Sequence, residues 1–382
     1  MQITDIQTMH CGAPAAPGAR LNRVWTFVRI ETDSGIHGTG ECSLFKVNQA
    51  VAEVVERFGT FLIGQDPTRV EHLWQQMYRH PFFRGGPILN AAISGIDMAL
   101  WDIAGKVAGL PAYRMLGGPV RDRVRAYARA DLGGSEIDQV LDAQRQGFTA
   151  FKIAPPHLEG GFNEFALAKA AVELVAAVRA AAGPELDLMI DFHGRLSPAA
   201  AVRFLDGVRD QDLLFAEELI PPDNVPAYAQ VTAAVPEVPC ATGERLYTRW
   251  GFRELIESRA VHVVQPDICY AGGISELRRI AAHAETHYIS MAPHNPNGPV
   301  ATAANIQLAA ATPNFLILEY ARKPPYFESV LQEPLAFADG HFALPEAPGL
   351  GVELDEAFIA ANPPHELEFG SDVYADGAVA DI

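Results

Sequence analysis

The sequence has little of what several common protein classes require. Its 382 residues include only four cysteines, and no two of them form a C-x-x-C pair. A disulfide framework is therefore excluded, and no zinc or redox motif is indicated. Basic residues number 29 against 47 acidic ones, so the formal net charge is −18. A chain this acidic is not expected to bind a nucleic-acid backbone or an anionic membrane, because both require clustered positive charge.

Long apolar runs and nucleotide-binding signatures are also missing. No stretch approaches the ~20 continuous apolar residues of a membrane span, and residues 1–25 hold no apolar run of signal-peptide length. There is no G-x-G-x-x-G after the first strand, no G-x-x-x-x-G-K-[ST] and no G-x-S-x-G elbow. Trp74, Trp101 and Trp250 are interpreted as core or interdomain packing rather than as a stacking platform. The composition, 49% hydrophobic and 20% charged, is typical of a globular protein. It predicts a soluble, cytoplasmic protein of about two to three domains.

Residues 1–118 are predicted to form an α+β domain. Val24–Thr32 is rich in β-formers, a turn signal lies at 33–35, and the strand pattern resumes over 36–41, which indicates a hairpin. Over 89–107 the apolar residues recur at steps of three and four, and Gly109 follows two residues later, so this helix should end there. Strands followed by helices, without alternation, favour an α+β fold.

Residues 119–323 alternate between strand-like and helical patterns. The strand-like runs lie at 124–128, 150–154, 186–192, 213–219, 239–242, 261–265, 288–292 and 315–319. Helical patterns such as 164–181 and 274–285 separate them. Eight such units in about 200 residues fit a (β/α)8 barrel, with a doubly wound open sheet as the alternative. The proline-rich segment 324–382 breaks the alternation and is predicted to return to the first domain.

Acidic residues end three successive predicted strands. Asp191, Glu217 and Glu244 are spaced by 26 and 27 residues, and the C-terminal ends of barrel strands are where function resides. Three carboxylates at one mouth repel one another unless they are neutralised, and oxygen ligands suit a hard cation such as Mg²⁺. Alternatively, each acid is solvated or pairs with Arg195 or Arg245. The regular spacing favours the metal site.

Two histidines also stand at strand ends. His294 follows the seventh predicted strand and Asp267 the sixth, so they should be neighbours around the barrel; a bonded carboxylate fixes the imidazole tautomer and raises its basicity. A histidine is more often structural, and of the 12 in this chain only His193 and His294 are singled out by position. The two-residue strand period should bring His193 beside Asp191. For the same reason only one of two adjacent acids can face the mouth, and Glu217 is favoured over Glu218.

Taken in order, these residues resemble the enolase superfamily, mandelate-racemase subgroup, and in particular its galactonate-dehydratase branch. The resemblance covers nearly the whole chain; each motif alone is weak, but the ordered set is highly specific. The motifs are FRGGP at 83–87, ALWDI at 99–103, Lys152, DFHGR at 191–195, EE at 217–218, GERLY at 243–247, QPD at 265–267, AGGI at 271–274, His294 and Glu319.

The resemblance implies an α/β fold in which an α+β N-terminal capping domain, completed by the C-terminal segment, covers a modified (β/α)7β TIM-type barrel. It implies one Mg²⁺ per active site, held by Asp191, Glu217 and Glu244, and a homo-oligomer. The implied activity is the dehydration of an acid sugar, an aldonate such as galactonate or gluconate. A base removes the proton alpha to the carboxylate and the 3-hydroxyl leaves, which gives a 2-keto-3-deoxy acid.

The resemblance also implies roles for single residues. His294, paired with Asp267, would be the base, and His193 the acid that protonates the departing hydroxyl. Lys152 and Glu319 would stabilise the enediolate electrostatically. The predicted substrate-binding residues are Arg195, Arg245 and Asn297.

Departures from the family pattern keep more than one activity open. Racemases of the subgroup resemble one another in a Lys-x-Lys on the second strand, but here the run at 152–154 is KIA. A two-base racemase therefore lacks one base unless His193 substitutes. The sequence is also compatible with an epimerase or cycloisomerase of a related carboxylate, and with a ligand-binding homologue without catalysis. The sugar configuration accepted is expected to depend on loops at 10–25, 43–50 and 80–86.

Overall fold

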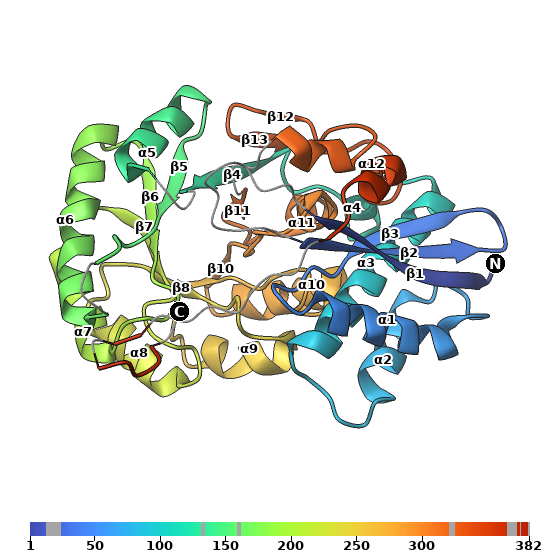
Figure 1. The fold of residues 1–382 in the computed structure, drawn as a ribbon, viewed down its shortest axis with the longest axis horizontal. Coiled ribbons are helices and arrows are strands. Elements are labelled where there is room, and N and C mark those ends of the chain that lie inside the picture. Colours follow the sequence, from blue (N-terminus) through green and yellow to red (C-terminus); the bar gives the residue numbers. More distant parts are fainter. Residues whose placement is uncertain are drawn as a thin grey trace.

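The protein consists of two units that lie side by side in the computed structural model (Figure 1). The structure describes residues 1–12, 24–130, 134–158, 162–320, 325–364, 373–374 and 376–380. Most of the predicted specificity loop at 10–25 lies outside these described residues.

The N-terminal unit begins with an antiparallel sheet in the order β1-β2-β3. These strands are β1 (Ile3–Gly12), β2 (Val24–Thr32) and β3 (His37–Glu41). The predicted hairpin is confirmed, because β2 pairs with β3; β1 adds a third strand by pairing with β2. The helices that follow are α1 (Asn48–Leu62), α2 (Val70–Arg79), α3 (Pro87–Ala108) and the short α4 (Ala112–Met115). The α+β organisation is therefore confirmed.

Helix α3 forms the core of this unit. Pro87 opens it, and Gly109, in the left-handed region, caps its C-terminus as the sequence predicted. By length and composition it is the one helix of the described residues that could span a membrane, but 83% of its apolar window is buried inside the protein. Gly40 of β3 allows the close approach of α3, since a Cβ there would overlap the carbonyl oxygen of Gly95.

The second unit is a closed ring of eight parallel strands, which confirms the barrel. They are β4 (Arg123–Arg129), β5 (Ala150–Ile153), β6 (Asp187–Asp191), β7 (Leu213–Glu217), β8 (Cys240–Thr242), β9 (Val263–Val264), β10 (Ser290–Met291) and β11 (Leu318–Glu319). Strands β4 to β10 pair in chain order and β11 pairs with β4. A parallel bridge from Met291 to Phe315 joins β10 to the segment that leads into β11 and closes the ring.

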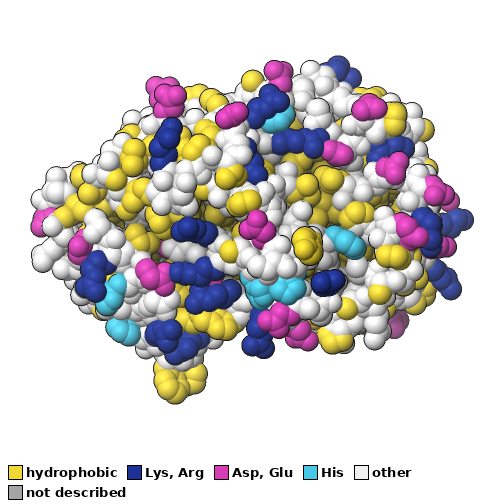
Figure 2. Space-filling view, turned by 180° about the vertical axis from the view of Figure 1, so that it is seen from behind, with side chains coloured by type: hydrophobic (Ala, Val, Ile, Leu, Met, Phe, Trp, Pro, Cys, Tyr) yellow, Lys and Arg dark blue, Asp and Glu magenta, His cyan; other side chains and the backbone are white. Residues whose placement is uncertain are grey.

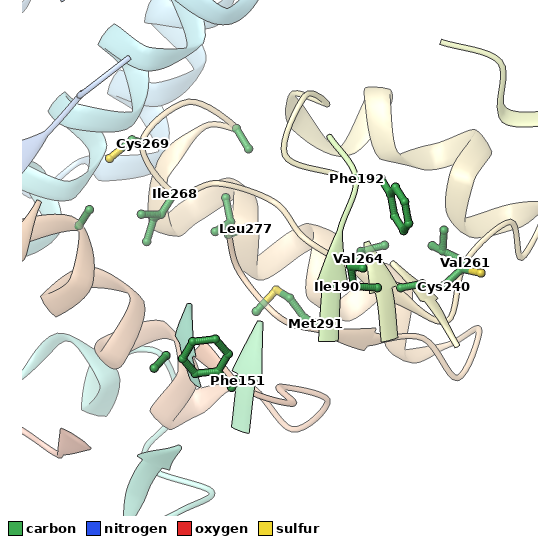
Figure 3. Packing of buried hydrophobic residues seen from close by; sticks show 14 of the residues in the cluster. Phe151, Ile190, Phe192, Cys240, Val261, Val264, Ile268, Cys269, Leu277 and Met291 are labelled. Atoms are coloured by element: carbon green, nitrogen blue, oxygen red, sulfur yellow. The ribbon is translucent and has the colours of Figure 1, made fainter. Parts of the chain in front are cut away.

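Helices α5 to α11 surround the ring (Figure 1). They are α5 (Glu136–Arg145), α6 (Glu164–Ala182), α7 (Pro198–Gly207), α8 (Val225–Ala234), α9 (Thr248–Glu257), α10 (Gly273–Glu285) and α11 (Pro299–Ala311). Outward-facing strand residues pack against them: Figure 3 shows Phe151, Ile190 and Met291 in the same buried cluster as Leu277 of α10. Strand side chains therefore pack both inside and outside the ring, which explains why these strands read as near-continuous apolar runs.

The segment after the barrel contacts both units. It contains the 3-10 helix η1 (Pro325–Val330), β12 (Phe337–Ala338), β13 (His341–Ala343) and α12 (Glu356–Ala361). Strand β13 pairs antiparallel with β4 of the barrel, whereas α12 packs against β1 of the N-terminal unit. Parts of the predicted 324–382 segment, including residues 365–372, lie outside the described residues.

Helices α2 and α3 dock on the N-terminus of α10. Asp97 accepts hydrogen bonds from the backbone N–H and the hydroxyl of Ser275, at 3.0 and 2.6 Å. The indole of Trp74 donates to the carbonyl of Gly272, and that of Trp101 donates to the Ser275 hydroxyl, both at 2.9 Å. These two tryptophans therefore serve packing between the units, as the sequence predicted.

Asp97 should make stability depend on pH. Burial raises its pKa to about 7, from an ordinary value of 3.8. Between these values the folded state binds more protons than the unfolded state, so the free energy of unfolding falls as the pH rises. Because Asp97→Asn cannot ionise, its destabilisation should be largest at low pH and shrink by up to about 1.4 kcal/mol per pH unit toward neutrality.

Urea unfolding of both proteins at several pH values across this window measures the difference. A destabilisation that stays constant, or that grows as the pH rises, would contradict the raised pKa of Asp97.

Candidate active site

A polar layer lies directly above an apolar layer inside the barrel. Eight apolar side chains, one from each strand or the residues next to it, form one buried cluster inside the ring: Tyr127, Ala150, Met189, Phe215, Ala241, Val263, Ala292 and Ile317. Two residues further along, seven of the eight positions carry Arg129, Lys152, Asp191, Glu217, Gln265, His294 and Glu319. Because strand side chains alternate with a period of two, both layers face inward, and the polar one lies at the C-terminal mouth.

Three carboxylates at this mouth form a candidate metal site. One oxygen from each of Asp191, Glu217 and Glu244 lies within 4.8 Å of the others. Oxygen ligands on opposite sides of one hard cation are about 4 to 5 Å apart, twice the metal–oxygen distance. Oε2 of Glu244 is buried and has no hydrogen-bond partner among the described residues. The donor set therefore fits a divalent cation.

Lys152 supplies the positive charge nearest to these acids. Its ammonium donates to both carboxylate oxygens of Glu217, at 2.8 and 2.9 Å, and lies 3.3 Å from Asp191. Burial disfavours the charged amine, but the charges of Glu217 and Glu319 outweigh it and raise the pKa of Lys152 well above its ordinary value. Burial and the charge of Asp191 raise the pKa of Glu217. One ammonium thus leaves the acids incompletely neutralised, and a divalent cation would complete the balance.

The predicted histidine–aspartate pair is brought together. Nδ1 of His294 lies 2.8 Å from Oδ2 of Asp267, and Nε2 lies 3.4 Å from the Glu244 carboxylate. With the Nδ1 proton directed at Asp267, Nε2 is the nitrogen that lies beside Glu244 of the three-acid cluster. Burial opposes the charged imidazole, but the charges of Glu244 and Glu319 and the hydrogen bond to Asp267 raise the pKa of His294 to about 10.

Asn297 contacts Asp267. Its side-chain nitrogen donates to both carboxylate oxygens of Asp267, at 2.9 and 2.8 Å, and the backbone N–H of Cys269 donates to Oδ1 at 2.7 Å. The hydroxyl of Tyr270 lies 3.0 Å from Nδ1 of His294. In this structure the amide nitrogen of Asn297, a predicted substrate-binding group, therefore orients Asp267.

His193 reaches the mouth by a different route from the predicted one. Strand β6 ends at Asp191, and His193 has a positive φ of 51°, so the strand period does not extend to it. The turn nevertheless places its Nε2 3.2 Å from Oδ2 of Asp191, with 46% of the side chain exposed. The expectation that the two residues lie together is met, but a left-handed turn is the reason.

The adjacent acids Glu217 and Glu218 point in different directions. Strand β7 ends at Glu217, and Glu218 has a positive φ of 42°. Its carboxylate pairs with the Arg245 guanidinium at 2.8 Å. Burial and the charge of Glu244 raise the pKa of Glu218 to about 8. Arg245 is thus engaged with Glu218, and Arg195 donates to the carbonyl of Phe192 at 3.1 Å.

Sequence reasoning assigned no role to two members of the polar layer, Arg129 and Gln265, although Gln265 lies in the QPD motif. The Nε of Arg129 lies 3.8 Å from a Glu319 oxygen. Gln265 is 1% exposed, and neither of its side-chain polar atoms has a hydrogen-bond partner in the described part of the chain. Both stand two residues after an inward-facing apolar residue of their strand. Applying the alternation to every strand, rather than searching for acids and histidines, would have found them.

Comparison with known proteins gives consistent matches over the chain. The model of the mandelate racemase / muconate lactonizing enzyme N-terminal domain matches residues 3–117, and that of the enolase C-terminal domain-like family matches residues 136–358. A D-galactonate dehydratase from Pectobacterium atrosepticum is 37% identical over 394 residues, covering 100% of both chains. One from Variovorax paradoxus is 40% identical, covering 94% of this chain and 96% of the relative.

A solved structure shares this fold. The crystal structure of an enolase, a putative galactarate dehydratase from Agrobacterium radiobacter with bound sodium and L-malate, superposes with a TM-score of 0.91. It is 31% identical, and the match covers 100% of both chains.

Glu217→Gln should weaken divalent-metal binding far more than Glu218→Gln. The first change replaces a carboxylate of the three-acid cluster by a neutral amide, whereas the second changes its neighbour in sequence, which pairs with Arg245. Mutation of a group that only supports a metal ligand typically lowers metal affinity about 10- to 100-fold. Glu217 would be a ligand itself, so Glu217→Gln should lower the affinity at least about 100-fold. Titration calorimetry with Mg²⁺ or Mn²⁺ measures both variants; equal losses would argue against this placement of the metal.

Proposed function

The chain belongs to the enolase superfamily, in the mandelate racemase / muconate lactonizing enzyme family, and from that premise we propose that it dehydrates an aldonate such as galactonate or gluconate with Mg²⁺ as its metal. It is a hydro-lyase of the sugar acid dehydratase type. The observation that carries the proposal is the three-carboxylate cluster beside the histidine–aspartate pair, with His294 Nε2 3.4 Å from Glu244.

An anionic substrate suits this site in spite of the net charge of −18. Lys152 and Arg129 belong to the inward-facing layer, and a bound divalent cation would add two positive charges, so together they would offset the buried carboxylates of the mouth. The field inside a cleft is set by these near groups more than by distant surface charge. On the face shown in Figure 2, basic and acidic side chains are interspersed, so no single sign dominates that surface.

Bound Mg²⁺ would be held by Asp191, Glu217 and Glu244 and would supply a Lewis acid against the negative charge that develops on the substrate carboxylate. The Lys152 ammonium would stabilise the same charge. Burial opposes the ionised form of Glu319, but Lys152 and His294 outweigh it and lower the pKa of Glu319 to about 2. An ionised Glu319 would contribute by holding the Lys152 ammonium, which lies 3.6 Å away.

Nε2 of His294 would take the α-proton, while its Nδ1–H stays hydrogen-bonded to Asp267. A protonated imidazole cannot act as a base, so His294 would accept the α-proton only when a bound cation lowers its pKa from about 10. A divalent cation held by Glu244 would offset the charge of that carboxylate, which is the largest interaction that raises the pKa of His294. His193 would then donate a proton to the 3-hydroxyl as the C3–O bond breaks, water leaves, and the enol tautomerises to the 2-keto acid.

Product formation should require both an aldonate and the metal. Incubation with galactonate or gluconate and Mg²⁺ should give a keto acid that is detected as its semicarbazone. EDTA should abolish it, because the acids at the mouth are then left without their counter-charge. Turnover that EDTA does not diminish would contradict the metal assignment, and α-proton exchange without loss of water would favour an epimerase.

The two histidines should separate the two proton transfers. His294→Asn should lose both α-proton exchange and dehydration, each by at least about 10²-fold. His193→Asn should keep exchange and lose dehydration, since the α-proton leaves on the other histidine. Proton NMR in D₂O reports both rates, and His72→Asn on the exposed face of α2 is the control. Loss of exchange in His193→Asn as well would assign the first step to both residues.

A further inference from the structure

The start of α11 receives its cap from the other unit. Gly298, the N-cap residue, has no side chain, and Pro299 has no N–H, so α11 provides no side-chain cap of its own. Glu41, at the end of β3, supplies one. Its two oxygens accept the backbone N–H groups of Gly298 and Ala301, at 2.6 and 2.9 Å. A buried carboxylate is favourable there because of the helix dipole and the charge-assisted hydrogen bonds.

This contact is tightly built. A Cβ on Gly298 would lie 2.7 Å from both carboxylate oxygens of Glu41, so only glycine admits the carboxylate at this distance. The hydroxyl of Ser43 donates to the same carboxylate at 2.7 Å from within the N-terminal unit. Glu41 itself is fully buried. The position of the first turn of α11 is therefore set by the N-terminal unit.

The capped turn carries a group that orients the histidine–aspartate pair. Asn297 directly precedes Gly298 and donates to both oxygens of Asp267. Asp267 in turn lies 2.8 Å from Nδ1 of His294. The side chains along this path are buried: Asn297 is 7% exposed, Asp267 0% and His294 8%. A continuous path of hydrogen bonds and peptide bonds thus runs from Glu41 to the imidazole.

We propose that Glu41 is a positioning residue for proton abstraction: by capping α11 it holds Asn297 against Asp267 and so fixes the imidazole of His294. The inference rests on the proposed function in that His294 is taken as the base. Proton transfer is sensitive to placement, and a shift of about 1 Å can cost about 10²-fold in rate. Glu41 acts through other residues, so its loss should lower kcat and leave substrate affinity nearly unchanged.

Asp102 provides a matched control. It is a fully buried carboxylate of the same unit and accepts two backbone N–H groups, from Thr39 at 3.0 Å and Leu350 at 2.8 Å. These bonds join α3 to β3 and to the C-terminal segment rather than to α11. Glu41→Gln and Asp102→Asn each remove one charge and one acceptor at nearly constant shape, so both should lower the unfolding temperature.

Steady-state kinetics on the Mg²⁺-loaded, full-length proteins test the inference. Glu41→Gln should lower kcat by roughly 10- to 100-fold with KM within about twofold of wild type, while Asp102→Asn should keep kcat within about twofold. Ser43→Ala removes one bond to the Glu41 carboxylate and the acceptor of the Thr26 N–H. It should give an intermediate kcat, which keeps the test available if Glu41→Gln does not fold. Equal kcat losses in the Glu41 and Asp102 variants, or wild-type kcat in Glu41→Gln, would overturn the inference.

Amide hydrogen exchange tests the same path without substrate. In Glu41→Gln the amide of Gly298 should exchange faster, and so should that of Cys269, which donates to Asp267. Faster exchange at Gly298 with no change at Cys269 would overturn the inference even if the wild type dehydrates a sugar acid. A wild type inactive on every aldonate, with faster exchange at Cys269 in the variant, would refute the proposed function alone and support the structural path.

Discussion

The crowding of negative charge at the barrel mouth is the constraint on which the rest of this structure depends. Four carboxylates there are at most 4% exposed: Asp191, Glu217, Asp267 and Glu319. An ionised group taken out of water is costly unless it is paired and hydrogen-bonded, and well-packed apolar residues often stabilise a fold as well or better. Stability alone therefore gives no reason for this set, which indicates that it is kept for chemistry.

The buried acids differ in the groups that compensate their negative charge, and this difference distinguishes their roles. Asp267 is satisfied by the protein, through the amide of Asn297 and a backbone N–H. Glu319 accepts the backbone N–H of Asn295 and lies near Lys152. The cluster of Asp191, Glu217 and Glu244 is different, because one oxygen from each of its three acids lies within 4.8 Å of the others, which suits coordination of a single cation. The protein neutralises its positioning acids itself and leaves the three-carboxylate cluster for a cation.

The sequence was sufficient where a pattern repeats. All eight barrel strands were located because strand-like runs recur through the chain, and the three-acid cluster followed from its place at successive strand ends.

The sequence was insufficient where single backbone angles decide the direction of a side chain. The positive φ values at His193 and Glu218 turn these side chains, and no periodicity encodes such turns. The two-residue strand β12 has no measurable alternation either. Gln265 was named in the QPD motif but given no role because an amide carries no charge signal, although strand parity places it in the mouth.

Contacts between the units are beyond periodicity, and they tie the N-terminal unit to the chemistry. Glu41 and Gly298 are 257 residues apart, and nothing in either local pattern points to the other. The loop after β9 is held in the same way, since the hydroxyl of Ser94 in α3 accepts the N–H of Gly272. Both loops that carry the histidine–aspartate pair are thus bonded to the unit that covers the barrel. A change in how that unit sits must therefore alter the orientation of the base as well as the space left for the sugar, so substrate selection and proton transfer are not structurally independent in this protein.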